Sequence, residues 1–138
     1  MIFQHVKNLT QYIKAIREIE RMLELPPKPF VPVFKKRPGV ILGVGYTLPL
    51  IPGYLQEKKV LAFAVHEVRH VLQKQKKLRL IREEEVKNLL LPPEAISAIR
   101  KEARRGDEEV DAEIVERISV PLLRQGRVEE FKRLMLDS

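Results

Sequence analysis

The stretch FAVHEVRHVLQ, residues 63–73, contains His66, Glu67 and His70 in the order H-E-x-x-H. Residues four apart on a helix lie on the same face, with Cβ atoms about 5–6 Å apart, so the two imidazoles can bind one metal ion. Glu67 then lies beside the pair, where its carboxylate can take a proton from a water molecule that the metal activates. The motif therefore predicts a metal site with His66 and His70 as ligands and Glu67 as general base.

The alternative interpretation of this stretch is an ordinary buried helix whose two histidines are structural. Histidines buried among apolar residues need partners, because an unpaired polar group in a core is costly. The surroundings of the motif are the most apolar of any predicted helix, with side chains at Val60, Leu61, Phe63, Ala64, Val65, Val68, Val71 and Leu72. This context favours the metal site.

The rest of the chain predicts a mostly helical α+β fold. Apolar residues three, four or seven apart indicate an amphipathic helix over 4–24, which the prolines of PPKPF end. Residues 30–52 are rich in Val, Ile, Phe and Tyr and predict two or three short strands, in which Gly43 and Gly45 allow close approach of another backbone. The motif helix is predicted over 57–76, and a glutamate-rich helix over 107–120 is interrupted at Pro121. We expect a single domain, 1–138, with an appendage over 121–138.

Composition limits the classes of function. The chain has no cysteine, which excludes disulfides, cysteine-ligated zinc and thiol nucleophiles. Its net charge of +7 invites a nucleic-acid partner, but the basic residues are scattered, so we do not expect one. The N-terminal residues lack the apolar core of a signal peptide, and the uncharged segment 39–55 is too short to cross a membrane. We expect a cytoplasmic protein without a membrane span, with a composition that fits a thermophile.

A catalytic zinc usually keeps three protein ligands and one water, so a third ligand is needed. A third motif histidine is absent, because Gln73 and Lys76 occupy the positions of an H-x-x-G-x-x-H extension. His5, the remaining histidine, is expected to be exposed. A downstream carboxylate is left, and four candidates cluster within GDEEVDAEIVERISVP: Glu108, Glu109, Asp111 and Glu113. Acids near a helix N-terminus are also favoured simply by the helix dipole.

Residues 109–113, Glu-Val-Asp-Ala-Glu, resemble the E-x-x-A-D signature of gluzincin peptidases. The resemblance implies that Glu109 binds zinc and that Glu113 supports a motif histidine, with Glu113 and Glu108 as rival ligands. The order of helix, small sheet, H-E-x-x-H helix and glutamate helix is similar to the soluble minigluzincins and to the catalytic cores of membrane gluzincin peptidases. This similarity covers roughly residues 4–120 and implies a zincin-like fold.

Two departures from the gluzincin pattern stand out. Arg69 is charged where most such peptidases have an uncharged residue, and we expect it to pair with an acid in 107–116, joining the two helices. The family often has a Tyr or His after the second motif to stabilise the oxyanion, and this chain has neither beyond His70. Tyr46, Tyr54 or Arg117 would have to substitute.

The function implied by the resemblance is a zinc-dependent endopeptidase, with zinc as cofactor and a peptide or protein as substrate. The uncharged strand around 40–47 would bind an extended peptide by strand addition. One alternative is a small basic helical module that binds nucleic acid or protein and has structural histidines. The other is a latent zinc protein without activity, its cleft occupied by its own tail.

The tail over 121–138 contains apolar residues three or four apart, at Val128, Phe131, Leu134 and Met135. This spacing predicts an amphipathic helix whose apolar face must be covered. It either completes the core, forms a homodimer contact, or lies over the cleft and blocks substrate, as in a zymogen.

Overall fold

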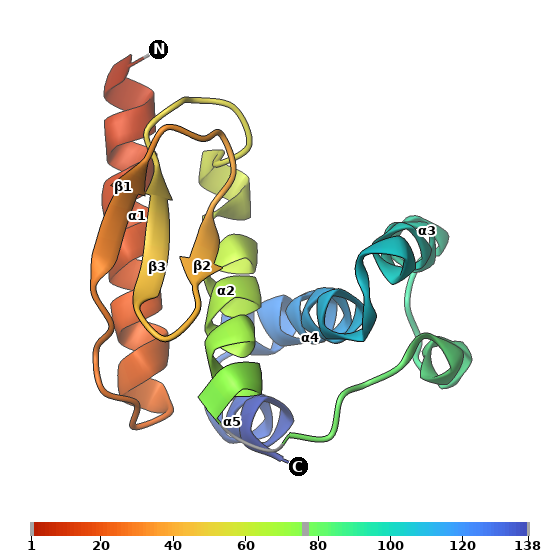
Figure 1. Ribbon diagram of the computed structural model, residues 1–138. Helices are drawn as coiled ribbons and strands as arrows, with labels where there is room; N and C mark the ends of the chain where they lie inside the picture. Colours follow the sequence, from red (N-terminus) through yellow and green to blue (C-terminus); the bar gives the residue numbers. More distant parts are fainter. Residues whose placement is uncertain (1, 76–77, 138) are drawn as a thin grey trace.

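The computed structural model describes residues 2–75 and 78–137 of the 138-residue chain. The long helix α1 (Ile2–Met22) lies beside a small sheet of strands β1 (Phe30–Val33), β2 (Gly39–Ile41) and β3 (Gly45–Pro49). The motif helix α2 (Val60–Gln75) follows, and α3 (Pro93–Glu102), α4 (Asp107–Arg124) and α5 (Val128–Leu136) complete the order (Figure 1). The predicted α+β class is confirmed.

The sheet has the order β1-β3-β2, so β2 is an edge strand. β1 pairs with β3 in parallel, and β2 pairs with β3 antiparallel through a turn at 42–44. Gly45 allows the close approach that was predicted, because a Cβ there would collide with the Pro29 carbonyl. Gly43 has a different role, since its φ of 74° places it in the left-handed region that the turn requires.

The main core lies between α1, α2 and the sheet. It includes Tyr12, Ile16, Tyr46, Val68 and Leu72, each with no exposed surface. A smaller apolar cluster, Val86, Ile99, Val110 and Ile114, packs α3 and the 3-10 helix Glu83–Asn88 against α4. None of the described helices is long and apolar enough to cross a membrane.

His5 is buried, so its predicted exposure is wrong. Its Nε2 lies 2.8 Å from the Pro49 carbonyl oxygen, and Asn8 Nδ2 donates to the Leu55 carbonyl at 3.1 Å. These contacts attach the start of α1 to the end of β3 and to the loop that follows it. The burial of His5 could not be predicted from the sequence pattern around it, because the loop that covers His5 is distant in the chain.

Helix boundaries differ from the prediction at two places. Residues 57–59 form a 3-10 turn before α2 begins at Val60, and Lys76 lies outside the described residues. α4 does not stop before Pro121 but continues to Arg124. Pro121 removes one backbone donor, but the last turn is held by the Gln125 N–H, which donates to the Pro121 carbonyl at 3.1 Å. The first residues of the predicted appendage thus belong to α4.

α5 completes the core. Its Phe131 and Met135 have no exposed surface and pack against the main cluster. The carbonyl of Met135 also accepts a hydrogen bond of 2.8 Å from Arg69 Nη1 on α2. The prediction that the tail completes the core is therefore confirmed.

We expect deletion of residues 126–138 to unfold the protein. Loss of Phe131 and Met135 from the core should cost about 5 kcal/mol or more, because each leaves a cavity. The whole free energy of unfolding of a small domain is about 5–15 kcal/mol. Circular dichroism on heating measures the loss, and Glu129→Ala, at an exposed position of α5, should leave the melting curve unchanged. A truncated protein that kept its cooperative melting transition would contradict this assignment.

Candidate metal centre

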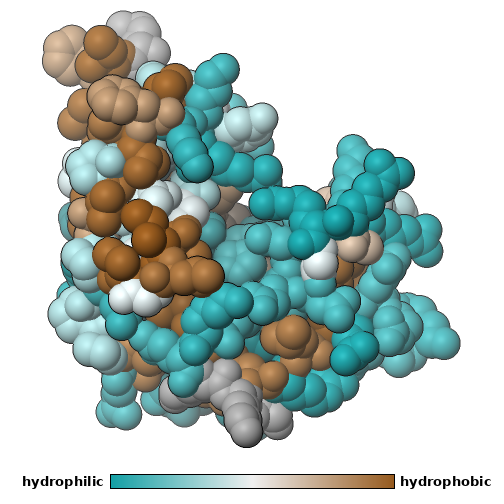
Figure 2. All heavy atoms as spheres, viewed as in Figure 1, coloured by the Kyte–Doolittle hydropathy of each residue, from teal (hydrophilic) through white to brown (hydrophobic). Residues whose placement is uncertain are grey.

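A cleft of about 320 Å³ lies between α2, α4 and the sheet edge. His66, Glu67 and His70 line its α2 side, and Glu109 and Glu113 line its α4 side. Pro38, Gly39, Val40 and Leu42, from β2 and its flanks, form the opposite wall. Figure 2 shows a hollow between the sheet side and the helical side, bordered by hydrophilic side chains. No residue of α5 lines the cleft, so the reading of the tail as a plug is wrong.

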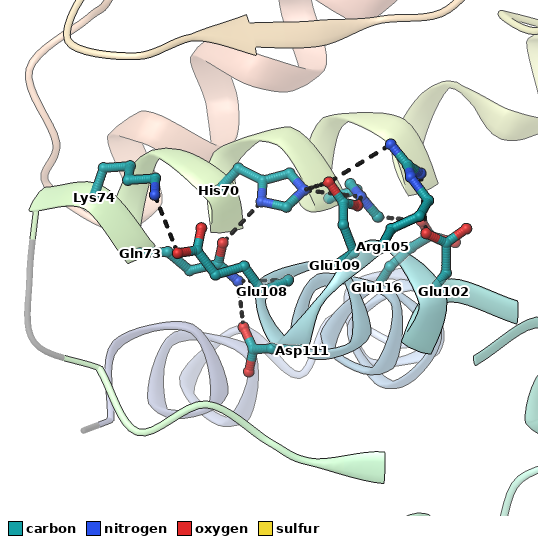
Figure 3. A network of polar contacts seen from close by, with 10 residues as sticks. His70, Gln73, Lys74, Glu102, Arg105, Glu108, Glu109, Asp111 and Glu116 are labelled. Atoms are coloured by element: carbon teal, nitrogen blue, oxygen red, sulfur yellow. Dashed lines mark hydrogen bonds and ion pairs between the residues drawn. The ribbon is translucent and has the colours of Figure 1, made fainter. Parts of the chain in front are cut away.

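Three side chains from two helices converge in this cleft. His66 Nε2 lies 3.2 Å from His70 Nε2 and 3.3 Å from Glu109 Oε2. His70 Nε2 lies 3.2 Å from Glu109 Oε1 (Figure 3). Ligands of a tetrahedral zinc with bonds of about 2.0–2.1 Å are about 3.3–3.4 Å apart. The spacing of the two nitrogens and the carboxylate therefore suits three ligands of one small cation.

The other ring nitrogens are fixed by partners that leave both Nε2 atoms unprotonated in the neutral rings. His66 Nδ1 lies 3.1 Å from Glu116 Oε1, and a carboxylate can only accept, so Nδ1–H donates. His70 Nδ1 donates in the same way to Gln73 Oε1 at 2.8 Å. Gln73 is itself oriented, because its Nε2 donates to the Glu108 carbonyl at 2.9 Å and to Asp111 Oδ2 at 2.7 Å.

The two lone pairs consequently point toward each other and toward a carboxylate, which is repulsive unless a proton or a metal lies between them. Burial alone would lower the pKa of His66, but hydrogen bonds to Glu109 and Glu116 outweigh it and raise the pKa to about 10. The pKa of His70 is also raised, against the effect of burial, by its contact with Glu109. The pKa of Glu109 is held far below its usual range by the same histidines. His66, Glu67 and His70 form a group that could hold a metal ion, and Glu109 lies at ligand spacing from both histidines.

Glu67 lies beside the convergence point and is nearly buried. Burial raises its pKa to about 7, although the charges of His66 and His70 oppose the rise. A carboxyl group with a pKa near neutrality can both accept and return a proton, which is what a general base that later acts as acid requires. Its placement is that predicted from the motif.

Arg69 pairs with an acid of α4, and this prediction is confirmed. Its guanidinium donates to both carboxylate oxygens of Asp111, from Nε at 2.6 Å and from Nη2 at 2.9 Å. Both side chains are almost fully buried. Further donation to the carbonyls of Met135 and Arg79 joins α2, α4, α5 and the segment after α2. The charged residue inside the motif therefore joins these segments as a buried clamp and does not line the cleft.

The acid that contacts a motif histidine is Glu116, whose carboxylate accepts from His66 Nδ1, and not Glu113, to which the resemblance gave that role. Glu113 Oε2 is buried and makes no hydrogen bond to the described residues, and burial raises the pKa of Glu113 to about 7. His66, Glu113 and Glu116 form a second group that could hold a cation. Arg117 Nε already lies 3.7 and 3.9 Å from these two carboxylates, which favours a pairing role. Glu108, a rival ligand, pairs with Lys74 at 3.1 Å (Figure 3).

The predicted candidates for an oxyanion stabiliser do not reach the cleft. Tyr46 is wholly buried in the core, with its ring against Phe30. Neither Tyr54 nor Arg117 is among the residues that line the cleft. Two arginines that were not considered from the sequence do line it, and they are Arg37 before β2 and Arg105 before α4. Neither carries a local signal in the sequence, because the cleft is lined by segments that are distant in the chain.

Comparison with models of protein families, with curated proteins and with solved structures finds no match to this chain.

Proposed function

We propose that this protein is a zinc-dependent endopeptidase of the gluzincin type. The observation that carries the proposal is the convergence of His66 Nε2, His70 Nε2 and the Glu109 carboxylate at 3.2–3.3 Å, with both tautomers fixed from outside. Two neutral imidazoles and one carboxylate are a donor set that suits zinc, and three ligands leave one position open for water.

Zinc in this position would supply a Lewis acid and an activated water. The work of the chain itself is to hold the ligands and move the proton. Glu67 would accept the proton from the attacking water and deliver it to the leaving amine. Arg37 or Arg105 would lie close to the oxygen that becomes negative, in place of the Tyr or His of related enzymes.

The edge strand β2 supports a peptide as substrate. Among the described strands, β2 pairs with β3 on one side only, and Gly39 and Val40 line the cleft. A free edge offers backbone donors and acceptors to an extended chain.

The rival reading, a basic binding module with structural histidines, explains less. It accounts for the hydrogen bonds of both rings but not for the convergence of two Nε2 atoms and the Glu109 carboxylate in a cleft that Glu67 also lines.

Replacing His66 with alanine should remove the metal. The intact chain is expected to hold about one zinc per molecule, and the variant to bind zinc at least about 100-fold more weakly, since even an outer-shell partner is worth about 10–100-fold. Elemental analysis and competition with a chromogenic chelator measure this. The matched control is His5→Ala, which removes a buried histidine distant from the cleft and should keep its zinc. Intact protein that purified with no zinc and took up none would end the proposal.

A further inference from the structure

One end of the molecule carries a cluster of exposed apolar side chains. The start of α1 projects there beyond the ends of β1 and β3 (Figure 1). The members of this apolar tip are Ile2, Phe3, Val6, Phe34, Leu50, Ile51 and Tyr54, with exposures from 37% to 85%. Phe3 and Phe34 are both 85% exposed. Figure 2 shows the corresponding gathering of hydrophobic side chains at the upper end.

Backbone contacts hold the segments of the apolar tip together. The Leu50 N–H donates to the Val33 carbonyl at 2.9 Å, and the Ile51 N–H donates to the Lys35 carbonyl at 3.2 Å. The contact of His5 with Pro49 attaches the first turns of α1 to the same loop. The tip is therefore one surface made by three segments. Single exposed apolar residues are ordinary, but a group gathered at one end of the molecule that includes two phenylalanines indicates a binding surface.

The surroundings of the apolar tip are basic. The segments that form it, 2–7, 34–37 and 50–59, contain Lys7, Lys35, Lys36, Arg37, Lys58 and Lys59 but only one acidic residue, Glu57. Each of these basic side chains is exposed. The partner should therefore be anionic as well as apolar. Two copies of the chain would bring like charges together, and a nucleic acid would leave the phenylalanines in water.

We propose that the apolar tip docks this protein onto an anionic lipid surface. Aromatic and aliphatic side chains would enter the boundary between headgroups and acyl chains, while the surrounding lysines contact lipid phosphates. The attachment is peripheral and needs no span. None of the apolar residues of the tip lines the cleft, although Arg37 belongs to the border of both.

The proposal is tested by sedimentation of the full chain with vesicles of phosphatidylcholine, with and without 30% phosphatidylglycerol. We expect binding to the anionic vesicles only, and weaker binding at higher salt because the Debye length shortens. Phe3→Ser with Phe34→Ser should reduce the partition coefficient about tenfold or more, since both side chains lose their apolar contact. Lys35→Glu with Lys36→Glu should reduce it about 25-fold or more, at about fivefold per lost lysine.

The matched control is Leu90→Ser, which changes a fully exposed apolar residue distant from the tip and should bind as the parent does. Circular dichroism establishes that each variant is folded. Equal binding to both vesicle types, or no binding by the parent, would overturn the proposal. So would a dimer in light scattering that the phenylalanine variant converts to a monomer, because a second copy would then cover the tip.

Discussion

Glu67→Gln should leave zinc bound and lower the rate of peptide hydrolysis by about 100- to 10,000-fold, the range that a positioned general base supplies. The amide has nearly the shape of the carboxylate but cannot accept the proton. Glu67 is nearly buried beside the two histidines, so the change removes the base without opening the site. Cleavage of labelled casein and of a quenched peptide mixture gives the rate, and elemental analysis gives the zinc content.

The matched control for this prediction is Glu108→Gln. Glu108 lines the same cleft, but its carboxylate is exposed and pairs with Lys74. Because such a surface ion pair contributes less than about 1 kcal/mol, the rate of hydrolysis should stay within about threefold of the parent rate. If Glu67→Gln cleaved peptides as fast as the parent, the assignment of the base would be wrong even with zinc in place.

Arg69→Ala should lower the free energy of unfolding by about 3–5 kcal/mol, the usual cost of removing one partner of a buried ion pair. The change leaves the Asp111 carboxylate buried without its cation, and the carbonyl of Met135 loses its donor. Urea denaturation followed by circular dichroism measures the difference. Arg127→Ala is the matched control, because Arg127 also contacts a carboxylate through two bonds, to Glu130, but at the surface. That change should cost less than about 1 kcal/mol.

A double-mutant cycle separates the ion pair from the other contacts of Arg69. Removing Asp111 as well should cost much less than the sum of the two single changes, because the two side chains contact each other directly. Additive costs would show that Arg69 acts through the backbone carbonyls alone.

The spacing of the H-E-x-x-H motif placed His66, Glu67 and His70 correctly because a helix fixes the relation between residues three and four apart. The pairing of Arg69 was predictable for a similar reason, since a buried cation needs an acid and the acids cluster in one segment. Which acid meets which partner depends on how α2 and α4 cross. Sequence could therefore not distinguish Glu113 from Glu116 as the partner of His66, or find that Gln73 orients His70.

The sheet shows a second limit of the sequence. The composition of the segment predicts that a sheet exists. The face of the sheet on which each side chain lies depends on the register of the strands, and a shift of the register by one residue moves every side chain to the opposite face. Tyr46 pairs with Phe30 on one side and Val40 on the other, and it ends in the core instead of the cleft. His5 and the tail illustrate the same point, because both are buried by segments distant in the chain.

The clamp of Arg69 and Asp111 also determines how the cleft can open. Within the described residues, every hydrogen bond and ion pair from an α2 side chain to another segment goes to α4, to α5 or to the Arg79 carbonyl. α2 and α4 are thus joined at two places, by Arg69 with Asp111 and by the contacts of His66 with Glu109 and Glu116, and we expect this to restrain sliding and rotation of one helix against the other. In the part of the chain that the structure describes, the hairpin of β2 and β3 contacts α2 through apolar packing and not through side-chain hydrogen bonds or ion pairs. We therefore expect any change in the width of the cleft to come from the hairpin, while the spacing of His66, His70 and Glu109 stays constant.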